Sequence, residues 1–127
     1  FPGRGAPAQL VPWCTFTDPE LAHAGLTAAE AREKYGARQV SVHRHELAHN
    51  DRARADGTTD GLIVIVTVKD RIVGAHALTP AAGELIHELA IAIRFGVALD
   101  ELSELVHIYW LHEIQAADRI FLRQQFR

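Results

Sequence analysis

The chain has 127 residues, of which 48% are hydrophobic and 23% are charged, and this length fits a single domain. Thirteen basic against 16 acidic side chains give a formal charge of −3, which argues against a broad nucleic-acid-binding surface. No hydrophobic run approaches the roughly 20 residues that span a bilayer, and the single cysteine, Cys14, cannot form an internal disulfide. We therefore expect a cytoplasmic domain whose partners are neither nucleic acid nor membrane.

The first nine residues predict a flexible lead-in, because they hold two prolines and two glycines and have no hydrophobic period. The chain starts without a methionine or a signal peptide, which suggests a processed or excised piece. From residue 10 to residue 127 we expect one domain. Its first segment, Leu10 to Phe16, is typical of a short strand, and Asp18-Pro19 ends it because a residue before proline avoids helical space.

Capping signals predict a short helix at residues 27–35. Thr27 and Glu30 form a capping box, in which the hydroxyl and the carboxylate satisfy unpaired amide donors at the start of the helix. Gly36 supplies the left-handed residue that ends it.

Residues 39–45 alternate in polarity, which predicts a half-buried strand. Val40 and Val42 share one face of this strand. His43 and His45 share the other face, which we interpret as solvated rather than as a pair of metal ligands.

Residues 49–61 are polar and predict a crossing loop. Leu62 to Val68 is nearly continuous in β-branched residues, as is typical of a strand covered on both faces. Lys69-Asp70 is short enough for a hairpin turn into a further strand, residues 71–78, so these two strands should pair antiparallel.

Residues 80–95 predict an amphipathic helix that Gly96 ends. The helix is hydrophobic around more of its circumference than one core contact needs, so we expect part of it to form a contact between two subunits. The residues expected there are Leu85, Ile86, Leu89 and Ile93. Two further helices are predicted at 100–106 and 111–126. The fold class is α+β, a small antiparallel sheet with helices packed on it.

His45-Glu46-Leu47-Ala48-His49 spells HExxH, the signature of zinc metallopeptidases. That chemistry needs both imidazoles on one helical turn, about 6 Å apart, with Glu46 activating a zinc-bound water. A strand pattern precedes the motif here, and in an extended strand the two histidines would stand ~13 Å apart and could not share an ion. A small zinc hydrolase using His45, Glu46 and His49 is the alternative function.

Two other groups of residues carry potential chemistry. Cys14 is predicted to be an inert thiol, because no electropositive neighbour is close in the sequence. His107, Tyr109 and Glu113 place an imidazole, a phenol and a carboxylate near the start of the last predicted helix. On spacing alone they are either a catalytic group or an amphipathic junction. The sequence contains no dinucleotide-binding fingerprint, P-loop or nucleophile elbow.

Several segments, taken in order, resemble one known family. They are residues 11–20, 25–27, 30–31, 50–53, 60–61, 71–75, 82–86 and 107–109. From about residue 10 to residue 110 the chain is similar to the C-terminal dimerisation domain of pyridine nucleotide-disulfide oxidoreductases, the relatives of dihydrolipoamide dehydrogenase, glutathione reductase and mercuric reductase. The resemblance implies an α+β domain that makes a homodimer of an FAD enzyme.

The resemblance also implies what this chain lacks and what its C-terminal part does. The family's FAD domain, NAD(P) domain and redox-active cysteine pair precede this domain, so we expect the isolated chain to hold no cofactor and to be inactive. The family's closing motif, H-x-[HY]-P-T followed by a glutamate, reaches the partner subunit's flavin. His107 and Tyr109 match its first and third positions, with Tyr109 in the place of the catalytic histidine, as in mercuric-reductase-like members. Trp110 and Leu111 replace its proline and threonine, and Glu113 comes one residue early.

We therefore expect a homodimerisation domain of an FAD- and NAD(P)-dependent disulfide oxidoreductase. In the parent enzyme, His107, Tyr109 and Glu113 would complete the active site of the partner subunit. The zinc hydrolase above and a stand-alone binding module are the alternatives.

Overall fold

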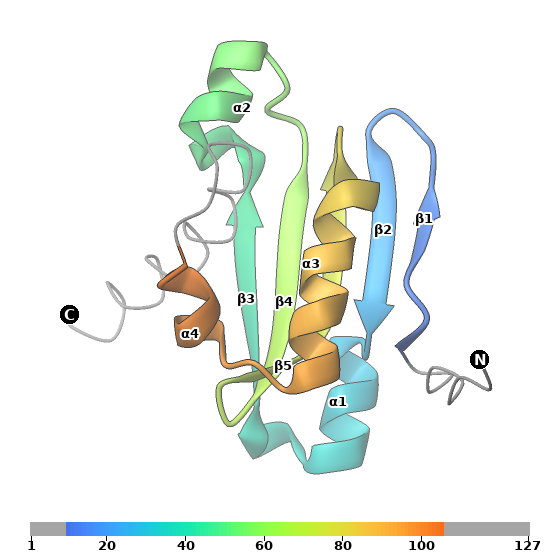
Figure 1. Ribbon diagram of the computed structural model, residues 1–127, viewed down its shortest axis with the longest axis vertical. Coiled ribbons are helices and arrows are strands. Elements are labelled where there is room, and N and C mark those ends of the chain that lie inside the picture. Colours follow the sequence, from blue (N-terminus) through green and yellow to red (C-terminus); the bar gives the residue numbers. More distant parts are fainter. Residues whose placement is uncertain (1–9, 106–127) are drawn as a thin grey trace.

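Five antiparallel strands form one sheet in the order β1-β2-β5-β4-β3 (Figure 1). The computed structural model describes residues 10–105. The strands are β1 (Trp13–Thr15), β2 (Glu20–Gly25), β3 (Val40–Glu46), β4 (Leu62–Val68) and β5 (Arg71–Thr79). The helices are α1 (Ala28–Tyr35), α2 (Asp51–Asp56), α3 (Ala82–Phe95) and α4 (Leu99–Ser103), with short 3-10 turns η2 (Ala37–Gln39) and η3 (Leu47–His49). The predicted α+β fold is confirmed. The first nine residues and the helix predicted at 111–126 lie outside the described residues.

One face of the sheet is covered by α3, which runs along it in Figure 1 and contacts β2 and β5. Four of the side chains that β2 and β5 turn toward the helix are buried alanines: Ala22, Ala24, Ala75 and Ala77. Alanine brings the helix close to the sheet, and Ile63 and Ile65 of β4 fill the space beside it. The core of the domain therefore lies between α3 and this face.

The hairpin between β4 and β5 is confirmed. Its two turn residues, Lys69 and Asp70, both have positive φ angles, 48° and 66°, as the right-handed twist of a two-residue hairpin requires. A register shift between Val66 and Thr67 is a β-bulge in this pair.

Strand β2 was not predicted from the sequence. It pairs with β5 over six positions and lies between β1 and β5. Its hydrophobic positions are the alanines Ala22 and Ala24, and alanine has a weak β propensity. The residues of β2 therefore give no clear strand pattern of their own, and the segment becomes a strand because it pairs with β5.

The orientation of β3 corrects the expectation for its histidines. His43 and His45 are 8% and 1% exposed, whereas Arg44 and Glu46 on the opposite face are exposed. Their register partners in β4 are Ile65 and Ile63, which are core residues. The period of two correctly predicted a strand, but both faces hold polar residues, so the pattern did not reveal which face is buried.

The predicted capping box at the start of α1 is confirmed. The Thr27 hydroxyl accepts a hydrogen bond from the Glu30 amide at 3.2 Å, and the Glu30 carboxylate accepts one from the Thr27 amide at 2.8 Å. The hydrogen bonds that the Glu30 carboxylate accepts from the Thr27 amide and the Thr27 hydroxyl lower the pKa of Glu30. Gly36 ends the helix with φ of 88°, but its ψ of 138° is outside the left-handed helical region.

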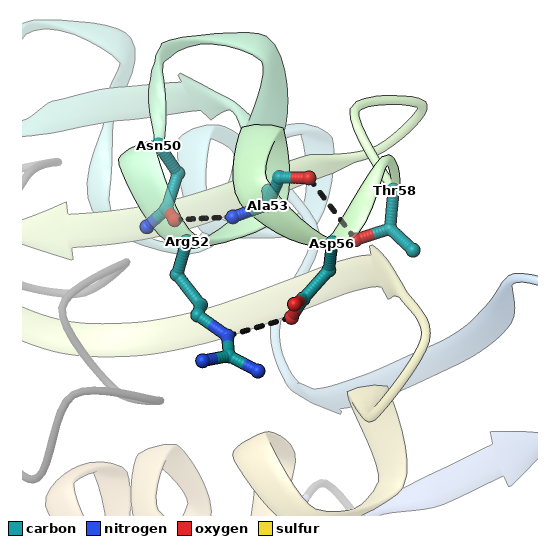
Figure 2. Close-up of polar contacts among 5 residues, drawn as sticks. All are labelled: Asn50, Arg52, Ala53, Asp56 and Thr58. Atoms are coloured by element: carbon teal, nitrogen blue, oxygen red, sulfur yellow. Dashed lines mark hydrogen bonds and ion pairs between the residues drawn. The ribbon is translucent and has the colours of Figure 1, made fainter.

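The polar segment 49–61 corrects the prediction of a loop, because it contains α2. Asn50 caps this helix by accepting a hydrogen bond from the amide of Ala53 at 2.9 Å, and the Thr58 hydroxyl donates to the carbonyl of Ala53 (Figure 2). Arg52 and Asp56 form an exposed ion pair at 2.7 Å along the helix. The helix is short and mostly exposed, so it lacks the hydrophobic period by which helices are predicted.

The helix predicted at 100–106 is present as α4, which begins at Leu99 and ends at Ser103. Leu99 and Leu102 are buried in the core. In Figure 1, α1 and α2 lie at opposite ends of the sheet, and α4 lies beside the β3 edge.

Candidate functional site

The HExxH motif is split by the fold. His45 lies in β3 with its ring in the core, Glu46 ends the strand and points to its opposite face, and His49 lies exposed in η3. The two histidines are therefore not on one helical turn. Among residues 10–105, no group of three or more His, Cys, Asp or Glu residues is arranged to hold a metal ion. The zinc-hydrolase alternative is not supported.

His43 and His45 are both buried in the core, but their rings differ in hydrogen bonding. A buried hydrogen bond of 3.0 Å joins the Nε2 of His43 and the Thr67 hydroxyl. Both ring nitrogens of His45 lack a hydrogen-bond partner among the described residues. Burial lowers the pKa of His45, the positive charge of His49 lowers it further, and Glu46 opposes the shift. The ring of His45 therefore resists protonation.

The helix residues predicted to contact a partner subunit are mostly inside this chain. Leu85, Ile86 and Leu89 are at most 3% exposed because they pack on the sheet, and Ile93 is half-buried against the same core. Their hydrophobic surface is therefore covered within one chain. The large exposed hydrophobic residues of α3 are instead Ile91 and Phe95, at 60% and 77% exposure.

The N-terminus of α3 is joined to the sheet by a carboxylate. Glu20 of β2 accepts a hydrogen bond from the amide of Gly83 at 3.0 Å, and the Cys14 thiol lies 3.9 Å from the same oxygen. Burial raises the pKa of Cys14, and the negative charge of Glu20 and its hydrogen bond raise it further. A thiol held protonated in this way is a poor nucleophile, in line with the predicted inert cysteine.

The face of the sheet opposite α3 carries a polar pair that the sequence analysis missed. His23 of β2 and His76 of β5 are register partners, and their Nδ1 atoms are 2.9 Å apart. The ring of Trp13 lies against His23 with centroids 5.4 Å apart. The triplet Ala-His-Ala occurs in both strands, at residues 22–24 and 75–77, and is the sequence signal that could have revealed the pair.

This pair lines a concave surface between the sheet face and α1. The open pocket formed by this surface has a volume of about 1040 Å³. Its hydrophobic wall includes Trp13 and Leu21, which are 49% and 41% exposed. Its polar side is formed by α1 with Glu30 and Lys34. The surface thus combines exposed hydrophobic area with two imidazoles, the carboxylates of Glu30 and Glu33, and the ammonium group of Lys34.

The predicted catalytic residues His107, Tyr109 and Glu113 lie outside the described residues, so their roles remain predictions. Within residues 10–105, no helix is both long enough and hydrophobic enough to cross a membrane.

Comparisons with known proteins place this fold and sequence in one family. Residues 11–114 match the family model of the pyridine nucleotide-disulphide oxidoreductase dimerisation domain. Mitochondrial dihydrolipoyl dehydrogenase from Homo sapiens is 33% identical over 103 residues, which make up 80% of this chain and 20% of that protein. The chain thus spans about one fifth of the length of the curated relatives it matches.

Solved structures of flavoprotein disulfide reductases and related proteins share the fold, and two of them serve as examples. LpdA from Mycobacterium tuberculosis superimposes with a TM-score of 0.80 at 24% identity, covering 91% of this chain and 26% of LpdA. The HOCl-induced flavoprotein disulfide reductase RclA from Escherichia coli gives a TM-score of 0.72 at 24% identity, covering 79% of this chain and 23% of RclA. The chain belongs to the family of pyridine nucleotide-disulphide oxidoreductase dimerisation domains.

Proposed function

We propose that this chain makes a homodimer of an FAD-dependent, NAD(P)H-linked disulfide oxidoreductase. The match of residues 11–114 to a dimerisation domain is the observation that carries the proposal. The fold supports it, because α3 packs on β2 and β5 and keeps Ile91 and Phe95 exposed on its outer side. The FAD and NAD(P) sites belong to the other domains of the parent enzyme.

The contact between subunits involves the solvent-facing side of α3. Ile91 and Phe95 are the large hydrophobic side chains exposed there, and Leu85, Ile86 and Leu89 support the helix from beneath. A two-fold contact places the same patch of both chains together, so a few exposed hydrophobic residues on one helix are used twice. Burying them would remove hydrophobic surface from water in each copy.

In the parent enzyme, His107, Tyr109 and Glu113 act across the interface on the partner's flavin or disulfide site. A phenol is a poor base at neutral pH, so Tyr109 favours a mercuric-reductase-like site over one with a histidine base. The single cysteine supports a reducing compartment, and we place the enzyme in the cytoplasm. The net negative charge of the chain argues against nucleic-acid binding.

The proposal is tested by charge substitutions on α3. Ile91→Glu combined with Phe95→Glu should shift a dimer to monomer in sedimentation velocity, because two buried carboxylates per subunit cannot be desolvated without partners. Arg94→Gln on the same helix is the matched control, since Arg94 is exposed and polar, and it should leave the dimer intact. A double variant that dimerises as tightly as the control would contradict the placement of the interface on α3.

A further inference from the structure

His23 and His76 lie side by side on the open face of the sheet. They are register partners on adjacent strands, so the backbone holds both rings at the same level of the sheet. Their Nδ1 atoms are 2.9 Å apart, and the rings are inclined at 37° with centroids 4.7 Å apart. Two ring nitrogens at this distance share one proton, because one must donate and the other must accept.

The surroundings orient the ring of His76. Its ring also makes a hydrogen bond to the backbone of Leu26. Nδ1 faces His23, so Nε2 is the nitrogen left for that bond. A neutral histidine that donates one ring N–H to a carbonyl presents a lone pair on its other nitrogen. Histidines that ligate metals commonly make this hydrogen bond with the nitrogen that does not bind the metal.

We propose that His23 and His76 together bind a divalent transition metal ion, with Cu(II) preferred, through their two Nδ1 atoms. Two neighbouring nitrogen ligands, each about 2.0 Å from a tetragonal Cu(II) ion, stand about 2.8 Å apart. The 2.9 Å separation in this chain therefore needs little movement of the strands. Cu(II) also stands highest among the divalent first-row metals for imidazole ligands.

The proton balance of binding is simple. In the metal-free pair one Nδ1 carries a proton, and that proton leaves Nδ1 when the ion binds. It either moves to Nε2 of the same ring by way of water or is released to solvent. No redox change occurs.

The concave surface has room for the rest of the coordination sphere. It is open to solvent, so water would fill the positions that the two histidines leave, because no third His, Cys, Asp or Glu among the described residues completes the set. Glu30 of α1 lies close enough for its charge to interact with both histidines, and a carboxylate favours a nearby cation. Lys34 is the basic side chain on the same surface and opposes this effect.

The test uses Trp13 as a built-in reporter. Its ring lies against His23, and Cu(II) quenches tryptophan fluorescence at short range. The chain has two tryptophans, so Trp110→Phe leaves Trp13 as the only one. In that background, CuCl2 titrated at neutral pH should quench fluorescence with one equivalent, and the electron paramagnetic resonance spectrum should show nitrogen ligands.

Matched variants separate this site from other histidines of the chain. His23→Gln and His76→Gln should each weaken the quenching transition at least tenfold, while His87→Gln, an exposed histidine of α3, should leave it unchanged. Circular dichroism establishes that each variant is folded, and His76→Asn replaces any His76→Gln protein that is not. Quenching that survives either substitution at the site, or that is lost equally in the His87 control, would overturn the proposal.

Discussion

The carboxylate of Glu20 and the amide of Gly83 are joined by a 3.0 Å hydrogen bond, although the two residues are 63 positions apart. Glu20 belongs to β2, and Gly83 lies in the first turn of α3. A negative charge at this point satisfies an unpaired amide and interacts favourably with the helix dipole. Two segments by which the chain resembles its family, residues 11–20 and 82–86, therefore meet in space and fix α3 on the sheet.

Replacing Glu20 with Gln should lower the free energy of unfolding by about 1 kcal/mol, because the charge at the start of α3 is lost. Urea denaturation measures this. The same change should speed the reaction of Cys14 with iodoacetamide at mildly alkaline pH, since the Glu20 carboxylate raises the pKa of that thiol. Glu33→Gln, an exposed carboxylate of α1, is the control. Equal stability and equal thiol reactivity in both variants would contradict this role of Glu20.

Replacing His45 with Leu should stabilise the chain by about 1 kcal/mol at pH 7.5, because a buried ring with two unpartnered nitrogens gives way to a hydrocarbon of similar size. The folded state lowers the pKa of His45. Above the unfolded pKa of about 6.5 the ring is neutral in both states and the shift has no effect. As pH falls below that value the unfolded chain takes up the proton first, so the wild type loses stability until the folded ring is protonated too.

The gain from His45→Leu should therefore grow between pH 7.5 and pH 5, as measured by urea denaturation at both values. Some acid sensitivity should remain in the variant, since the pKa of His76 is also lowered, first by burial and then by His23. A variant that is less stable than wild type at neutral pH would show that His45 has a partner in the folded chain.

Gly74 has no room for a side chain. A Cβ at this position would overlap the carbonyl group of Leu26, whose own amide donates a hydrogen bond to the carbonyl of Val73 at 2.9 Å. We expect Gly74→Ala to cost about 3 kcal/mol or more, because backbone on both sides must move. Gly36→Ala is the matched control: its φ is 88° but nothing lies within 4 Å, so it should cost about 1 kcal/mol. Similar thermal stability of the two variants would contradict this packing.

The sequence predicted those elements whose own residues carry a strong local signal. Thr27 with Glu30 predicted α1, the β-branched run predicted β4, and Lys69-Asp70 predicted the hairpin. These patterns depend on residues that are close together in the sequence, so they can be recognised without the tertiary structure.

The remaining features depend on distant residues. The alanines of β2 become a strand only beside β5, and the histidines of β3 are buried because their partners in β4 are isoleucines. For the same reason the hydrophobic excess of α3 was assigned to a subunit contact, although Leu85, Ile86 and Leu89 fill the chain's own core. The pairing of His23 with His76 likewise arises from strand register.

Self-association is the function proposed for this domain, and the molar mass in solution tests it most directly. Light scattering on the purified chain across a dilution series should give twice the chain mass of 14.0 kDa at the higher concentrations, with any dissociation following mass action. A mass of 14.0 kDa at every concentration would contradict a domain whose function is to dimerise.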